Sequence, residues 1–156
     1  MCLISIAGKG TRKYTDEVIE FIENGFYANS SGSGFMYKKE GEPFVYIKKG
    51  YFDLEKLLAD IKAADLKDED ELVIHHRIRT SGLANNLNTH PFVVSHKHED
   101  VITLDGKVNK PCLAHNGVFS LDYYEDLNPD FSDTYAFTRY IMSNKNILNL
   151  FKEESK

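Results

Sequence analysis

The chain has 156 residues, a formal net charge of −5 and a pI near 5.7. Hydrophobic residues make up 42% and charged residues 28%, which is typical of one globular domain and excludes a disordered, collagen-like or disulfide-stapled chain. An acidic chain without a Lys/Arg stripe among aromatics is not expected to bind nucleic acid. Without a leader pattern or a long apolar stretch, the sequence predicts one cytoplasmic domain over residues 1–156 that does not enter a membrane.

The chain begins with a short β-type run. Residues 3–7 predict a strand that closes at the glycines of residues 8–10, so Cys2 is expected at the mouth of this strand. The second cysteine, Cys112, lies far away in sequence, and the two are a poor framework for a disulfide. Cys112 is interpreted as a small buried hydrophobe.

Two helices are expected in the first half of the chain. Thr15 is the expected N-cap of a helix over residues 16–24, and Gly25 is expected in the left-handed position that ends it. Asp53 is expected to cap a second helix, whose apolar residues recur at i, i+3, i+4 and i+7. This periodicity indicates that the second helix covers one face of a sheet.

Several runs of β-type residues surround these helices. Residues 35–39 and 44–48 flank a turn-rich connection and predict a hairpin. Residues 72–78 predict a further strand. Residues 101–104 are interpreted as a strand that precedes an Asp105-Gly106 turn.

The end of the chain adds helical segments. Ser132 or Asp133 is expected to start a helix, and residues 147–151 form a second short apolar piece. Strands joined mostly by hairpin turns, with two helices early and one late, predict an α+β domain with helices packed on antiparallel sheets.

Cys2 is the first residue that suggests chemistry. Removal of Met1 would leave one residue with both a nucleophilic thiol and a free α-amine, whose reference pKa of about 7.7–8.0 suits it to accept the thiol proton. If Met1 stays, the nitrogen of Cys2 is an amide and cannot act as a base. Taken alone, a cysteine at position 2 is better explained as an accident of sequence, since any residue can follow the initiator.

Two polar segments follow the predicted strand of residues 72–78. Residues 75–82, His-His-Arg-Ile-Arg-Thr-Ser-Gly, carry arginine forks that can take a carboxylate in two parallel hydrogen bonds, or form a solvated strand end. Residues 88–92, Asn-Thr-His-Pro-Phe, predict a rigid loop in which Asn88 or His90 hydrogen-bonds neighbouring segments.

Two further motifs have both structural and functional interpretations. Residues 113–117, Leu-Ala-His-Asn-Gly, end in an Asn-Gly pair that predicts a type I′ hairpin turn. The alternative is an oxyanion hole, to which the side-chain amide of Asn116 and the backbone N–H of Gly117 donate. Residues 132–134, Ser-Asp-Thr, are typical of a helix cap, although Asp133 could also face a ligand ammonium.

In their order along the chain, these motifs resemble those of the class II glutamine amidotransferases. The motifs are Met-Cys at the start, His-Arg-x-Arg-Thr-Ser-Gly, Asn-Thr-His-Pro-Phe, Leu-Ala-His-Asn-Gly and Ser-Asp-Thr, and they cover residues 2 to about 141. The resemblance implies the four-layer αββα sandwich of the N-terminal nucleophile hydrolases, C-terminally abbreviated because the family's domain commonly continues past the Ser-Asp-Thr helix. Leu3 stands where many members have Gly, and Ser81 where many have His.

The resemblance also implies a role for each motif. Cys2 would attack the side-chain amide of L-glutamine, Asn116 and Gly117 would hold the oxyanion, Arg77 and Thr80 would bind the α-carboxylate, and Asp133 would bind the α-ammonium. Ammonia would leave through a thioester and reach an acceptor on a separate synthetase or acceptor-binding subunit, without a metal or organic cofactor.

Two other functions compete with this interpretation. The first keeps the fold but makes the chain an inactive glutamine-binding or regulatory module. The second is a metal-dependent hydrolase that uses His96 and His98 together with the His75-His76 pair. Adjacent histidines on a strand point to opposite faces of the sheet, which argues against the metal site.

Overall fold

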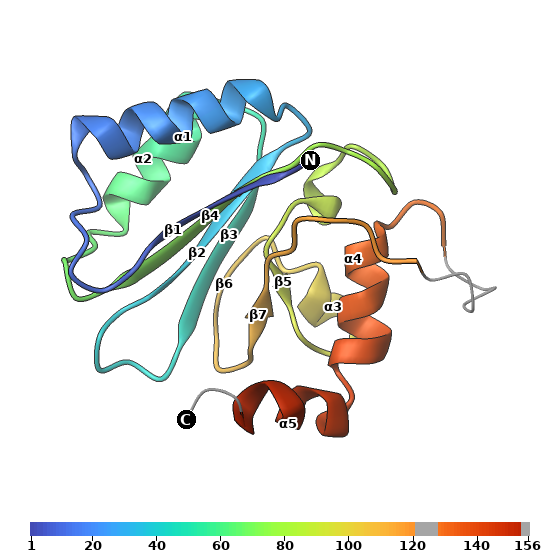
Figure 1. Cartoon of the computed structure of the whole chain (residues 1–156). Helices are drawn as coiled ribbons and strands as arrows, with labels where there is room; N and C mark the ends of the chain where they lie inside the picture. Colours follow the sequence, from blue (N-terminus) through green and yellow to red (C-terminus); the bar gives the residue numbers. More distant parts are fainter. Residues whose placement is uncertain (121–127, 154–156) are drawn as a thin grey trace.

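The computed structural model describes residues 1–120 and 128–153 (Figure 1). The strands are β1 (Leu3–Ala7), β2 (Ser33–Lys38), β3 (Val45–Tyr51), β4 (Glu71–His76), β5 (Phe92–Val93), β6 (Asp105–Val108) and β7 (Cys112–Leu113). Within the described part of the chain they form a five-stranded sheet in the order β1-β4-β2-β3-β6 and a two-stranded sheet of β5 and β7. The strand pairs in both sheets are antiparallel.

Helical segments lie on both sides of the five-stranded sheet. They are α1 (Asp16–Ala28), α2 (Leu54–Ala63), η1 (Asn86–Asn88), α3 (His98–Val101), α4 (Asp133–Ala136), η2 (Phe137–Met142) and α5 (Lys145–Glu153). Helices α1 and α2 cover one face, whereas β5, β7, α3 and α4 lie on the other side (Figure 1). The α+β architecture with antiparallel sheets that the sequence predicts is therefore confirmed.

Two apolar clusters hold these layers together. Between the five-stranded sheet and helices α1 and α2, the side chains of Ile22, Phe35 and Leu57 are 0% exposed. A second cluster, around Phe92 and Val101, joins β5 and α3 to α4. Burying each large apolar side chain stabilises the fold by roughly 1.5–3 kcal/mol. The two clusters therefore hold the helical layers against the strands.

The predicted helix starts are confirmed by their caps. The side-chain oxygens of Thr15, Asp53 and Ser132 accept hydrogen bonds from the backbone N–H three residues further on, at 3.3, 2.9 and 3.1 Å. Each bond satisfies one of the N–H groups that a helix start leaves without a partner. The predicted hairpin of residues 35–39 and 44–48 is also present, as the pair β2 and β3.

The predicted end of the first helix is wrong. Helix α1 continues to Ala28, and Gly25 lies buried inside it instead of in a left-handed cap. A Cβ atom at Gly25 would lie 2.6 Å from Cδ2 of His76 and 2.8 Å from Cδ2 of Leu3. Gly25 therefore allows α1 to pack closely on β4 and β1. It does not end the helix.

The interpretation of residues 101–104 as a strand, and of Asp105-Gly106 as a turn, is also wrong. Val101 ends α3 and is 0% exposed in the second cluster. Asp105 and Gly106 instead belong to β6, the edge strand that pairs with β3. The strand predicted over residues 72–78 ends earlier, at His76. Periodicity cannot separate a short apolar strand from a buried helix turn, and sheet pairing overrides the turn preference of Asp-Gly.

Replacement of Gly25 by alanine should destabilise the protein. Alanine gains up to about 1 kcal/mol in helix propensity, but its methyl group meets the His76 ring, and such overpacking costs about 1–3 kcal/mol. The His76 ring cannot easily move, because its Nδ1 lies 2.7 Å from Oγ of Ser33. Urea unfolding should show a lower free energy of unfolding for Gly25→Ala, whereas Asn24→Ala, at an exposed neighbouring position, should stay within about 0.5 kcal/mol of the wild type. Equal or higher stability of Gly25→Ala would contradict this packing argument.

Candidate functional site

The end of β4 places polar side chains inside the protein. His75, His76 and Arg77 are 1%, 0% and 3% exposed. Because side chains alternate along a strand, the two histidines face opposite sides of the sheet. Nδ1 of His76 lies 2.7 Å from Oγ of Ser33, whereas the ring of His75 stacks on that of His90 with centroids 3.9 Å apart.

Cys2 lies beside this strand end. Strands β1 and β4 are antiparallel with Leu3 opposite His76, so the residue before Leu3 meets the residues after His76. The Sγ atom of Cys2 accepts a hydrogen bond from the N–H of Ile78 at 3.4 Å and lies 3.5 Å from its carbonyl oxygen. Met1, the residue before Cys2, is 92% exposed.

Arg77 is held by the turn that follows β4. Its Nη1 donates to the carbonyl oxygen of Leu83 at 2.9 Å, and its Nη2 donates to that of Ser81 at 2.5 Å. Burial lowers the pKa of Arg77, while the nearby charges of Cys2 and Asp133 act to raise it. A guanidinium has five N–H donors and stays protonated, so donors remain for a carboxylate. Thr80, the other predicted carboxylate ligand, is exposed.

Asp133 lies at the start of α4 and joins two segments. Its Oδ1 accepts hydrogen bonds from Oγ of Ser81 at 2.8 Å and from the N–H of Thr134 at 2.9 Å. Its Oδ2 accepts a bond from the N–H of Phe119 at 2.7 Å. A carboxylate has about four acceptor positions, so these three bonds leave room for a further donor.

Asn116 and Gly117 lie in an exposed loop after β7. The predicted type I′ turn requires positive φ at both central residues, but outside glycine the described residues adopt positive φ only at Asp65. The loop, residues 115–119, is fixed at both ends. Nε2 of His75 lies 3.1 Å from the carbonyl oxygen of His115, and the N–H of Phe119 binds Asp133. Asn116 and Gly117 therefore lie between two anchors.

The loop of residues 88–92 provides a structural link that the sequence predicts. The side-chain nitrogen of Asn88 donates to the carbonyl oxygens of Leu83 and Asp130 at 3.1 and 2.7 Å. Its side-chain oxygen accepts from the N–H of Ser132 at 2.8 Å. Asn88 is 0% exposed, and it fixes the turn after β4 against the start of α4.

Four buried ionisable groups lie near this site, and of these only Lys49 was not named from the sequence. Burial lowers the pKa of both His75 and His76 to about 4, and that of His90 well below its usual value. Burial likewise lowers the pKa of Lys49 to about 7, and its Nζ lies 4.1 Å from the ring centroid of Phe92. Lys49 alternates with the apolar residues of β3, and its residue type gave no sign that it is buried.

Cys112 has a different environment from Cys2. Burial raises the pKa of its thiol to about 12, with the charge of Lys49 acting in the opposite direction. A thiol with such a pKa is almost entirely protonated near neutrality and is a poor nucleophile. This environment is consistent with the interpretation of Cys112 as a small hydrophobe.

The described residues do not support the metal site considered as an alternative. His96 is exposed, whereas Nδ1 of His98 lies 2.7 Å from the hydroxyl of Tyr135. Across residues 1–120 and 128–153, no group of three or more His, Cys, Asp or Glu side chains could hold a metal ion. In the same residues, no helix is both long enough and apolar enough to cross a membrane.

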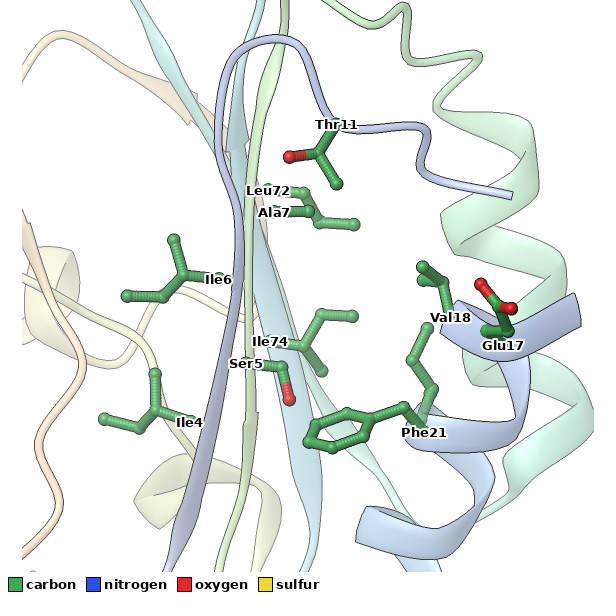
Figure 2. Close-up of a pocket in the computed structure, with 11 residues that line it drawn as sticks. Ile4, Ser5, Ile6, Ala7, Thr11, Glu17, Val18, Phe21, Leu72 and Ile74 are labelled. Atoms are coloured by element: carbon green, nitrogen blue, oxygen red, sulfur yellow. The ribbon is translucent and has the colours of Figure 1, made fainter. Parts of the chain in front are cut away.

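Two of the cavities among the described residues bear on the location of the site. An apolar cavity of about 400 Å³ separates β1 from α1, where Ser5 and Ala7 point towards the helix and Ile4 and Ile6 point away (Figure 2). None of the predicted site residues lines it. A cavity of about 570 Å³ is lined in part by Ser81, Gly82 and Asp133. Of the predicted site residues it touches Asp133 alone, so it lies at the end of the site predicted for the α-ammonium.

The chain was compared with protein families, with curated proteins and with solved structures. No family model, no curated protein and no solved structure matches it. The geometry around the end of β4 and the sequence motifs are therefore the grounds for assigning a function.

The buried histidines predict a loss of stability in acid. Their folded-state pKa values lie below the unfolded value of about 6.5, so the unfolded state binds more protons as the pH falls. The stability that these neutral histidines contribute should therefore be fully present above about pH 6.5. As the pH falls from there towards 4, the free energy of unfolding should decrease by at most about 1.4 kcal/mol per pH unit for each histidine.

Urea unfolding at several pH values measures this slope. His90→Gln should reduce it, whereas His96→Gln, at an exposed position, should leave it unchanged. A slope that is the same in wild type and in His90→Gln would show that His90 does not carry this linkage.

Proposed function

We propose that the protein hydrolyses the side-chain amide of L-glutamine as a class II amidotransferase, with Cys2 as nucleophile. The observation that carries the proposal is the end of β4. There Cys2 binds the backbone of Ile78, the buried Arg77 follows the strand, and Arg77 is linked through Ser81 to Asp133. The thiol is thus linked to the residue after the cation, and the cation is linked to the anion through Ser81.

The proposed fold is an abbreviated αββα sandwich of the N-terminal nucleophile hydrolases. Its support is the order of layers, with α1 and α2 on one face of the five-stranded sheet and the β5-β7 pair with α4 beyond the other face (Figure 1). The position of Cys2, directly before β1, also agrees with this fold.

Glutamine is a zwitterion and needs groups of both signs. Its α-carboxylate would bind the donors of Arg77 that the backbone carbonyls leave available. Its α-ammonium would bind the Asp133 carboxylate, which keeps an acceptor position. These two contacts would direct the side-chain amide of the substrate towards Cys2.

The proposed chemistry begins after removal of Met1. The α-amine of Cys2 takes the thiol proton, and Sγ attacks the amide carbon to give a tetrahedral oxyanion. The Asn116 side-chain amide and the Gly117 N–H donate to this oxyanion. Its collapse breaks the C–N bond, and the proton passes to the leaving ammonia. Water then hydrolyses the thioester through a second oxyanion, which releases glutamate and restores the thiol.

The released ammonia would pass to an acceptor on another chain. The alternative function is a glutamine-binding or regulatory module without activity. The observation that favours it is the cavity of about 570 Å³, which is lined in part by Ser81 and Asp133 but not by Cys2, Asn116 or Gly117. Binding of glutamine without ammonia release would distinguish this module from the enzyme.

A diazo-ketone analogue of glutamine should label Cys2 covalently. Intact-mass spectrometry of the purified protein should show a mass lower by one methionine and then a single adduct. The adduct should be absent in Cys2→Ala but retained in Cys112→Ala, because burial keeps the second thiol protonated. Retained Met1, or folded wild-type protein without an adduct, would instead support the inactive module.

Replacement of Asn116 by alanine should lower turnover more than substrate binding. Loss of one oxyanion donor typically reduces kcat by about 100- to 1,000-fold, with little change in KM. Ammonia release from glutamine measures both constants. Asn109→Ala is a matched control, since Asn109 is also exposed and lies in the connection before β7. Equal kcat values for the two variants would exclude Asn116 from the oxyanion hole.

A further inference from the structure

Ser81 contacts both charged ends of the proposed amino-acid site. Its carbonyl oxygen accepts a hydrogen bond from Nη2 of Arg77 at 2.5 Å. Its Oγ donates to Oδ1 of Asp133 at 2.8 Å and accepts from the N–H of Asp133 at 3.0 Å. Arg77 and Asp133 lie far apart in sequence, and Ser81 is a direct partner of each.

The turn that carries Ser81 is fixed by contacts that do not involve its side chain. The N–H of Leu83 donates to the carbonyl oxygen of Asp130 at 3.0 Å, and Asn88 bonds to both residues. A Cβ atom at Gly82 would lie 2.6 Å from the nitrogen of Ser132, so the two backbones are in close contact. Removal of the Ser81 hydroxyl should therefore leave the turn in place.

The effect of Ser81 extends to the loop of residues 115–119. Ser81 donates to one oxygen of Asp133, and the other oxygen accepts from the N–H of Phe119. The plane of the carboxylate is set by both bonds together with that from Thr134. Loss of the Ser81 bond would let the carboxylate rotate, which would disturb the ammonium contact and the anchor at Phe119.

We propose that Ser81 is a positioning residue that orients Asp133 and, through it, the loop bearing Asn116 and Gly117. This inference rests on the proposed function. The residue does not touch the reacting atoms, so its loss should weaken recognition of a glutamine-like substrate without altering the reactivity of the thiol itself. Loss of one hydrogen bond to a charged group should lower the second-order rate of labelling by about tenfold.

The test compares two reagents on Cys2. In Ser81→Ala, the second-order rate of labelling by the diazo-ketone analogue should fall about tenfold, mainly through a higher half-saturating concentration. Alkylation by iodoacetamide, which needs no amino-acid site, should keep the wild-type rate. Ser81→Thr retains a hydroxyl and should restore labelling.

Ser95→Ala is a matched control outside the site. Oγ of Ser95 likewise donates to a carboxylate, Oδ2 of Asp100, at 2.6 Å, and accepts from a backbone N–H, that of Lys97, at 3.2 Å. Its removal deletes a corresponding pair of bonds, together with a bond from Nζ of Lys110 at 3.5 Å, and should leave labelling by both reagents unchanged.

Amide hydrogen exchange provides a readout that does not depend on labelling. Exchange at the Phe119 N–H should be faster in Ser81→Ala than in wild type and unchanged in Ser95→Ala. Wild-type protein without labelling would overturn the proposed function. Wild type and Ser81→Ala with equal labelling and equal Phe119 exchange would leave the proposed function intact and overturn the role of Ser81.

Discussion

The buried guanidinium of Arg77 constrains the rest of the site. A charge that is 3% exposed is costly unless hydrogen-bond acceptors surround it, and here two backbone carbonyls serve that purpose. To supply them, the chain after β4 must fold back on itself between residues 79 and 83. That path brings Ser81 to Asp133 and therefore fixes where α4 begins relative to the sheet. The positions of the turn after β4 and of the start of α4 therefore both depend on the hydrogen bonds that the Arg77 guanidinium requires.

Local features of the fold were predictable because their causes are local. Thr15 and Asp53 cap helices through bonds to residues only three positions away. Features that depend on tertiary contact were not predictable. Gly25 lies inside a helix because His76, on another element, needs its space. Asp105 and Gly106 form part of an edge strand because they pair with β3, and no residue near Gly106 in the sequence indicates that pairing.

The same distinction applies to the candidate site. Cys2, Arg77 and Asp133 carry reactive or charged groups, so their residue types alone drew attention to them, and the structure connects them through contacts near the end of β4. Ser81 drew attention only because the class II amidotransferases, whose motifs the sequence resembles, often have His at this position. Its contact with Asp133 spans 52 residues of sequence, and neither its type nor its neighbours indicated that partner. Sequence motifs identified groups with chemistry, whereas the groups that orient them required the fold.

The start of β1 has a consequence for maturation. The strand begins at Leu3, and the residue before Cys2 is almost fully exposed, so the sheet contains no hydrogen bond that depends on Met1. Excision of Met1 would therefore create the α-amine beside the thiol without breaking a strand pair or moving a core side chain. Processing by a peptidase and folding would be independent events, so the chain could fold first and acquire its base afterwards. If Cys2 is the nucleophile that we propose, cleavage of that one peptide bond would supply its base in a site that is already folded.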